Sequence, residues 1–212
     1  MDYRKEYEKW LASPALSEDE RAELKALEGN DKEIKARFYG PLEFGTAGLR
    51  GTMYTGLHNM NRHVIRWATQ GFANVIRAEG TEAMQKGVAV CMDCRNHSAE
   101  FARETACVMA ANGIHVRLFE SLRPTPELSF AVREYGCQAG VNVTASHNPK
   151  EYNGYKVYWS DGAQLPPQHA AAIADELTRI DIFTGVRSMD YEQALAEGRI
   201  ELLGEDCDRR FM

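Results

Sequence analysis

The sequence predicts an α/β fold in which a mixed β-sheet is sandwiched between helices and carries a helical N-terminal extension. From residue 88 onward, short apolar runs alternate with helix-like segments, which is typical of strands joined by helices. Residues 2–38 instead show apolar residues at helical intervals within Glu-, Lys- and Arg-rich sequence. With 44% hydrophobic and 26% charged residues, the chain can form both a core and a hydrated surface.

The elements follow from these patterns in chain order. Residues 44–61 are rich in glycine and predict a loop with short extended pieces. Helices are expected over 62–79, 98–112, 125–135, about 167–178 and 190–197, and strands over 88–92, 114–119, 139–143, 155–159 and 199–203.

Three segments are therefore expected, since 212 residues exceed a typical single domain of about 100–150. They are a helical extension (1–40), the main domain (41–185) and a linker or start of a missing second domain (186–212).

Composition excludes several classes of function. No apolar run approaches the roughly 20 residues that span a bilayer, and the charged start "MDYRKEYEKW" is unlike a secretory signal, so we expect a cytoplasmic protein that does not act on membranes. The net charge of −6 opposes nucleic-acid binding, which uses clustered Lys and Arg. Any anionic ligand is expected to be small and held locally.

Five scattered cysteines, an odd number, predict reduced thiols. "CMDC" (91–94) follows a strand and precedes a helix, where a thioredoxin-like redox pair would lie. Cys91 also continues an apolar strand, which favours a buried structural thiol. A zinc site would need a second pair of ligands, and the sequence has none.

The strand at 139–143 is followed by "TASHNPKEYNG", which combines a serine, a histidine, lysines and turn formers in one loop at a strand end. A serine needs a base, a cation or a metal to react, and His147, Lys150 and Lys156 are close to Ser146 in sequence. No G-x-S-x-G motif supports hydrolase chemistry. The alternative is a simple hydrogen-bonded turn formed by Ser146, Asn148 and Pro149.

"TASHNPKEYNGYKVY" is similar to the active-site serine loop of the phosphoglucomutase/phosphomannomutase family, the α-D-phosphohexomutases. "FGTAGLRG" (44–51) resembles the arginine motif of that family, and "DCRNHS" (93–98) its third segment in this region. The resemblance runs from about Phe44 to Leu177. The helical lead-in and the spelling "GTAGLRG" are most similar to the branch of bacterial α-phosphoglucomutases and phosphopentomutase-like enzymes.

The resemblance implies that Ser146 carries a phosphoryl group and gives it to a sugar phosphate. Sugar 1-phosphate and 6-phosphate, with glucose as the first expected sugar, then interconvert through a bisphosphate. It assigns catalytic roles to Ser146 and Arg50, and to Lys156 for proton transfer or charge stabilisation. His147 is a candidate helper, although a single structural hydrogen bond in the turn is equally expected of it. Candidate phosphate-binding residues are Arg50, Arg95, Asn148 and Lys150, although an exposed arginine at a helix start is the alternative for Arg95.

The resemblance also implies Mg²⁺, with the phosphate on Ser146 as one ligand and three aspartates of a D-G-D-x-D-R loop as the others, and glucose 1,6-bisphosphate as activator. That loop is not found in residues 1–177. The tail "GEDCDRRFM" has Asp206, Asp208 and Arg209 at D-x-D-R spacing but lacks the leading D-G, and we interpret it as a decoy. The expected partners are a small phosphosugar and the remaining mutase domains of a longer chain.

The sequence leaves alternatives open. A phosphopentomutase or a bisphosphate-synthase variant would use the same serine loop, and so would a non-catalytic phosphosugar-binding module. The sugar-selecting loops of the family belong to later domains, so the sequence does not select among these alternatives.

Overall fold

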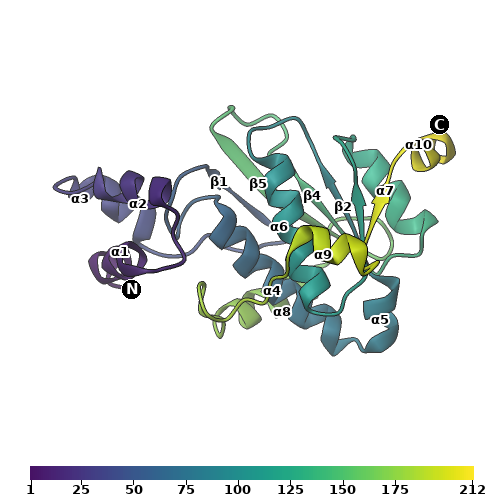
Figure 1. Ribbon diagram of the computed structural model, residues 1–212, viewed down its shortest axis with the longest axis horizontal. Coiled ribbons are helices and arrows are strands. Elements are labelled where there is room, and N and C mark those ends of the chain that lie inside the picture. The colour runs from purple at the N-terminus through teal and green to yellow at the C-terminus, as the bar shows by residue number, and fades with distance from the viewer.

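The computed structural model describes residues 1–212 and contains one six-stranded sheet with helices on both faces (Figure 1). The strands are β1 (Leu49–Thr52), β2 (Val88–Met92), β3 (Val116–Phe119), β4 (Ala139–Val143), β5 (Tyr152–Trp159) and β6 (Ile200–Leu203). The helices are α1 (Tyr3–Ala12), α2 (Glu18–Lys25), α3 (Asp31–Phe38), α4 (Arg62–Ala78), α5 (Thr81–Lys86), α6 (Ser98–Ala111), α7 (Thr125–Glu134), α8 (Pro167–Leu177), α9 (Tyr191–Ala196) and α10 (Glu205–Phe211).

The sheet is mixed, and its strand order is β1-β5-β4-β2-β3-β6. Strands β4, β2, β3 and β6 are parallel, whereas β5 is antiparallel to β4, and β1 is antiparallel to β5. The predicted α/β class with a mixed sheet between helices is therefore confirmed. Because β4 and β2 are adjacent and parallel, the loops that follow them emerge side by side at one edge of the sheet.

Two apolar clusters lie on opposite faces of the sheet. The larger contains residues of α4, α6 and α8 with one set of strand side chains, including Val141 and Tyr155. The smaller lies under α7 and includes Cys91, Leu128 and Tyr158. Tyr155 and Tyr158 point to different faces of β5, as expected for residues three positions apart along a strand.

Residues 186–212, expected as a linker or the start of another domain, contribute to this same sheet. Strand β6 pairs in parallel with β3, with Ile200 opposite Val116, and α9 packs on α6 while α10 packs on α7. Ile200 and Leu203 are buried from opposite faces, which explains why the short apolar pattern "RIELL" forms an edge strand.

Three elements differ from the sequence-based expectation. Helix α5 has six residues and α10 has one buried residue, Cys207, so neither shows a usable apolar periodicity. Strand β5 begins at Tyr152 because Asn153 and Gly154 continue the pairing with β1.

All five cysteines are unpaired in the structure, and only Cys94 is exposed. Cys91 is buried in β2, and burial raises the pKa of its thiol to about 12, although a hydrogen bond to the Arg123 carbonyl opposes this rise. A thiol with so high a pKa is a poor nucleophile, so the structure favours the buried structural thiol over the redox pair.

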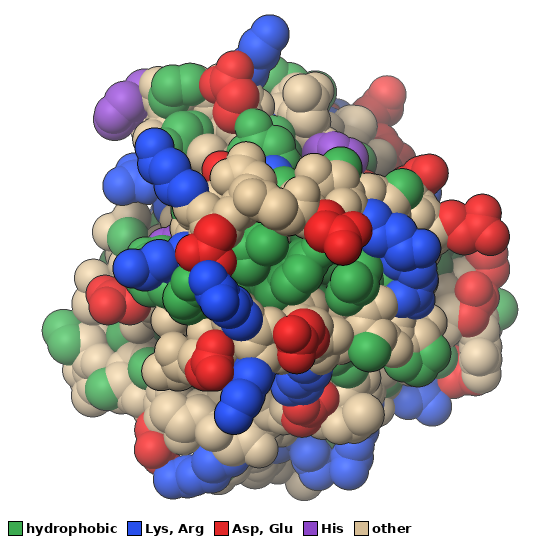
Figure 2. Space-filling view, turned by 90° about the vertical axis from the view of Figure 1, so that its left-hand side faces the viewer, with side chains coloured by type: hydrophobic (Ala, Val, Ile, Leu, Met, Phe, Trp, Pro, Cys, Tyr) green, Lys and Arg blue, Asp and Glu red, His purple; other side chains and the backbone are tan.

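Helices α1–α3 form the expected extension, at the left of Figure 1 and opposite the C-terminal helix α10. Trp10 is fully buried where the extension meets the sheet domain, with its ring 5.7 Å from Phe38, 5.6 Å from His63 and 5.0 Å from Phe183, measured between centroids. On this end of the molecule, side chains of both charge signs surround apolar ones (Figure 2).

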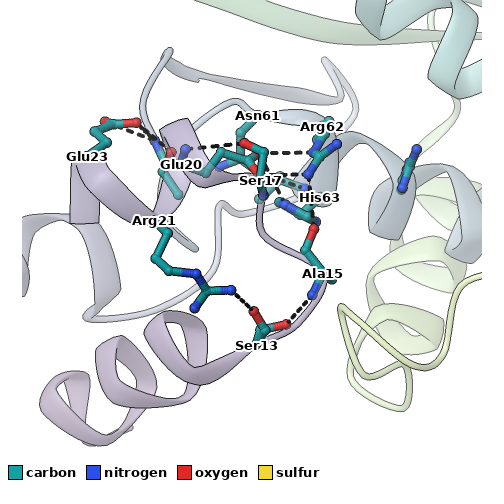
Figure 3. Close-up of polar contacts among 12 residues, drawn as sticks. Ser13, Ala15, Ser17, Glu20, Arg21, Glu23, Asn61, Arg62 and His63 are labelled. Atoms are coloured by element: carbon teal, nitrogen blue, oxygen red, sulfur yellow. Dashed lines mark hydrogen bonds and ion pairs between the residues drawn. The ribbon is translucent and has the colours of Figure 1, made fainter. Parts of the chain in front are cut away.

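An ion-pair network joins Glu20 of α2 to Arg62 and His63 at the start of α4 (Figure 3). The ring of His63 also contacts Trp10. The Ser17 backbone N–H donates to Glu20 at 2.8 Å, and both Nε and Nη2 of Arg62 donate to the two Glu20 oxygens at 3.0 and 2.7 Å. His63 Nε2 lies 3.2 Å from Glu20 Oε1. Burial opposes ionisation of Glu20, but His63, Ser17 and Arg62 outweigh it and hold its pKa at about 2. The extension is therefore attached by both apolar packing and a paired carboxylate.

Candidate active site

The serine loop (residues 144–151) leaves β4 and meets the loop of residues 93–97, which leaves β2. The Asp93 N–H donates to the Val143 carbonyl at 3.2 Å, and the Asn153 side chain donates to the Asn96 carbonyl at 3.0 Å. Two of the segments singled out in the sequence, "TASHNP" and "DCRNHS", thus lie together at the carboxyl ends of adjacent parallel strands, where sites of open α/β sheets are commonly found.

Ser146 is exposed and has φ of 57°, in the left-handed region that residues with a Cβ rarely adopt. The other non-glycine residue of the chain with positive φ is His97, at 61°, and it lies in the facing loop. Such conformations cost about 1–3 kcal/mol each and gather at functional sites. The strained serine is thus a candidate for the reactive group.

Arg50 and Asn148 meet at the site, since Arg50 Nη1 donates to Asn148 Oδ1 at 3.2 Å. Seven residues line a polar hollow of about 390 Å³ beside Ser146: Asp93, Cys94, Arg95, Asn96, Ser146, Asn148 and Lys150. Lys150 and Asn148 therefore line the hollow beside the serine, and Arg50 is connected to the hollow by its hydrogen bond to Asn148. Such a combination of cations and amide groups suits a small anion.

Lys156 lies on the same face of the sheet as Arg50. In the strand register Arg50 is opposite Gly154, two residues before Lys156, and Lys156 is opposite Asn142 of β4. The structure gives the Lys156 ammonium no hydrogen bond or ion pair within the chain. Its positive charge is thus available on the strand that follows the serine loop.

Two glycines allow these strands to approach the loop. A Cβ on Gly48, whose φ is 75°, would overlap the Tyr155 carbonyl, and a Cβ on Gly154 would lie 2.6 Å from the Thr144 carbonyl. Gly48 of "FGTAGLRG" and Gly154 of "NGYK" are therefore needed for the close approach of these strands to the loop.

His147 is exposed, and its Nδ1 lies 3.4 Å from Ser146 Oγ. The separation is at the long end of the hydrogen-bonding range, so the ring is adjacent to the serine hydroxyl without a strong bond to it. Both expectations for His147, helper or structural turn residue, remain compatible with this position.

Arg95, a candidate phosphate ligand in the sequence, instead donates to backbone carbonyls of the serine loop, among them Ser146 at 2.7 Å and Asn148 at 2.8 Å. It is half-buried and also lies 3.4 Å from Asp93. Four donors of the Arg95 guanidinium are therefore bonded to the protein backbone, and its role as a phosphate ligand stays a prediction.

Sequence reasoning missed two residues of the site, Asp93 and Thr144. Thr144 Oγ1 donates to Asp93 at 2.6 Å and accepts from the Ser146 N–H at 3.2 Å, while Ser98 Oγ donates to Asp93 at 2.9 Å. Asp93 lies in "DCRNHS" and Thr144 in "TASHNP". The sequence signal for both residues was therefore the motif as a whole and not one reactive side chain.

The residues of this chain do not fit a Mg²⁺ site by themselves. No group of three or more His, Cys, Asp or Glu side chains is placed to hold a metal, and the Asp93 oxygens accept from Thr144 and Ser98. In the tail, Asp208 forms two bonds with Arg123, at 2.7 and 2.9 Å, and Asp206 pairs with Arg209. The acidic tail residues are thus engaged with arginines, as expected of a decoy.

Comparison with known proteins agrees with the motifs. The family model described as "Phosphoglucomutase/phosphomannomutase, alpha/beta/alpha domain I" matches residues 41–182. A human phosphopentomutase is 41% identical over 156 residues, covering 71% of this chain and 26% of the relative. A Staphylococcus saprophyticus phosphoglucomutase is 35% identical over 181 residues, covering 85% of this chain and 32% of the relative.

The fold is also found in a solved structure, that of a putative phosphomannomutase from Thermus thermophilus. It superposes with a TM-score of 0.60 at 29% identity, covering 74% of this chain and 35% of that one. The chain therefore has the α/β domain of a phosphosugar mutase. It belongs to the phosphoglucomutase/phosphomannomutase family, in the branch that includes phosphopentomutases and phosphoglucomutases, and it spans about a quarter to a third of the length of these relatives.

None of the helices is both long and apolar enough to cross a bilayer.

Proposed function

We propose that this chain is the phosphoserine domain of a phosphosugar mutase, with Ser146 as the phosphoryl carrier. The observation that supports this most is the strained, exposed Ser146 beside a polar hollow that Lys150 and Asn148 line and that Arg50 approaches. Family membership agrees with the proposal, since the matched relatives are mutases.

The proposed chemistry is a pair of phosphoryl transfers. In the first transfer, the bond between phosphorus and Ser146 Oγ breaks as a sugar hydroxyl bonds to phosphorus and loses its proton. The bisphosphate then reorients, and in the second transfer its other phosphoryl group returns to Ser146 Oγ. Phosphoryl transfer depends mostly on positioning and on neutralising charge on the moving oxygens. Arg50 and Lys156 would supply that charge, and His147, 3.4 Å from Ser146 Oγ, would accept or return the proton.

The sugar is proposed as a phosphopentose or a phosphohexose. The relatives include phosphopentomutases and phosphoglucomutases, so glucose, the sugar expected first from the sequence, and a pentose such as ribose are both candidates. A bisphosphate-synthase activity would use the same first transfer. A non-catalytic binding module is the remaining alternative.

We further propose that the sugar-selecting loops and the Mg²⁺ ligands lie in mutase domains outside these 212 residues, with glucose 1,6-bisphosphate as the activator. The coverage of 26–32% of the relatives' length supports this proposal. No part of the chemistry above is assigned to the metal.

The test is a mutase assay with α-glucose 1-phosphate and, separately, α-ribose 1-phosphate, each with Mg²⁺ and a trace of the matching bisphosphate. The 212-residue chain should show negligible turnover, whereas the full-length protein should convert one of the two substrates. Ser146→Ala should abolish conversion, and Ser160→Ala, a change at an exposed serine outside the site, should not. Turnover by the 212-residue chain near the typical rate of about 10 s⁻¹ would contradict the need for further domains.

A further inference from the structure

Arg95 uses four of its five side-chain N–H donors in hydrogen bonds inside the protein. Nη2 donates to the carbonyls of Ser146 and Asn148 at 2.7 and 2.8 Å. Nη1 donates to the carbonyls of Pro149 and Tyr152 at 3.0 and 3.1 Å. Nε lies 3.4 Å from the Asp93 carboxylate. A guanidinium has five N–H donors, so four are bonded to backbone carbonyls and the fifth, on Nε, faces a carboxylate of the protein.

Asp93 holds the other side of Ser146. It accepts from Thr144 Oγ1 at 2.6 Å, and Thr144 Oγ1 in turn accepts from the Ser146 N–H at 3.2 Å. The Arg95 N–H also donates to Asp93, at 3.0 Å, which fixes the two residues relative to each other. The peptide group before Ser146 is thus tied to Asp93, and the peptide group after it to Arg95.

These contacts restrain the backbone on both sides of Ser146, whose conformation is strained. Ser146 has φ of 57°, which an L-residue adopts only when its surroundings impose it. The facing loop that supplies Asp93 and Arg95 includes His97, the second such residue, at 61°. This loop bonds the peptide group after Ser146 directly, through Arg95, and holds the peptide group before it indirectly, through Asp93 and the Thr144 hydroxyl.

We propose that Asp93 and Arg95 form a clamp that imposes the left-handed conformation on Ser146 and so keeps its Oγ at the polar hollow, ready for phosphoryl transfer. Arg95 is then a positioning residue and not a ligand of the substrate phosphate. This inference rests on the proposed function for its role in the reaction, but the clamp itself is a property of the 212-residue chain.

Lysine cannot replace Arg95 in this clamp. Its three donors share one nitrogen, whereas the four carbonyls are reached by two nitrogens of a planar group. Arg95→Lys, which keeps the positive charge, should therefore behave as Arg95→Met, which removes it. A role that depended only on charge would be rescued by lysine.

The direct test is NMR of the 212-residue chain. In Arg95→Met and Arg95→Lys, the ¹³Cα and ¹³Cβ signals of Ser146 should move toward those of extended backbone, and amide exchange over residues 144–152 should rise by about tenfold or more. Signals of β4 should stay in place. Arg50→Met is the matched control, because Arg50 makes one bond to the loop, through the Asn148 side chain; its exchange should stay within about twofold of the wild type.

A second measurement separates positioning from phosphate binding in the full-length protein. Arg95→Met should lower the maximum rate of Ser146 phosphorylation by glucose 1,6-bisphosphate at least tenfold and leave the half-saturating concentration within about twofold. A raised half-saturating concentration at an unchanged maximum rate would assign Arg95 to phosphate binding and overturn the proposal.

The clamp and the proposed function can fail separately. If Ser146 signals and loop exchange are unchanged in Arg95→Met, or if Arg95→Lys restores both, the clamp is wrong whatever Ser146 does. If the loop reorganises as expected but full-length protein never carries phosphate on Ser146, the clamp stands and the proposed function is wrong.

Discussion

The serine loop and the junction at Trp10 are both folded onto the sheet domain, but different forces hold them. At the junction, a fully buried Trp10 packs edge-on against three rings. At the loop, an exposed Ser146 in a strained conformation is held by two hydrogen bonds: Arg95 donates to its carbonyl, and its N–H donates to Thr144 Oγ1. The junction is thus stabilised by apolar burial, whereas the loop holds the serine in a defined position at a cost in stability.

Because different forces hold the two regions, substitutions at the junction should change stability, whereas substitutions at the loop should change chemistry. Loss of packing at the junction should lower the free energy of unfolding, because large buried side chains contribute most of the stability there. Loss of a polar group at the loop should mainly change chemistry, since the loop buries little apolar surface.

Trp10→Ala is expected to have the largest effect on stability. It should lower the free energy of unfolding by about 3–5 kcal/mol, since it removes a fully buried indole. Denaturant unfolding followed by circular dichroism measures this change. Leu122→Ala, at a residue 58% exposed, serves as the control and should change the free energy by less than about 0.5 kcal/mol. Equal effects of the two variants would remove the distinction between the junction and the surface.

Lys156→Met should act on chemistry alone. We expect phosphoryl transfer in the full-length protein to slow by about 100-fold, the usual cost of one stabilising charge or donor at a reaction centre, while Ser146 is still phosphorylated slowly by bisphosphate. Unfolding should be unchanged within about 0.5 kcal/mol. Lys32→Met, at an exposed residue of the extension, is the matched control. A Lys156→Met protein that is destabilised but fully active would contradict the assignment.

The pH dependence of the junction gives the smallest expected effect. The folded pKa of Glu20, about 2, lies below its ordinary value of 4.5, so ionised Glu20 stabilises the folded protein above about pH 4.5 and this contribution is lost as the pH falls toward 2. Glu20→Gln should therefore cost about 2 kcal/mol of stability near pH 6 and progressively less toward pH 2. Unfolding titrations at several pH values measure this. Glu18→Gln, at an exposed residue of the same helix, should reproduce the wild-type curve; a wild-type curve in Glu20→Gln would show that the network is not stabilising.

Much of this architecture was predictable, for reasons visible in particular elements. Strands β2 and β4 are short, mostly apolar and buried throughout, and each precedes a polar motif, so their bounds could be predicted from the sequence. Helix α10 could not be predicted, because its single buried residue gives no apolar periodicity. The placement of β6 could not be predicted either, because a strand of four residues carries no information about which strand it pairs with.

The site shows the same limit. Ser146, Arg50 and Asn148 were predicted from motifs and do come together. The role of Arg95 was not predictable, since a sequence shows that an arginine is near a serine but not whether its donors face a ligand or a backbone carbonyl. Backbone acceptors leave no mark in the sequence. Asp93 was overlooked because nothing in the sequence pairs it with the hydroxyl of Thr144, 51 residues away.

The most direct test of the central claim is peptide mapping by mass spectrometry of the full-length protein after incubation with glucose 1,6-bisphosphate. We predict one phosphoryl group, on the peptide that contains Ser146, and its loss in Ser146→Ala together with mutase activity. Phosphate found reproducibly on Thr144 or elsewhere, with Ser146→Ala still active, would contradict the account.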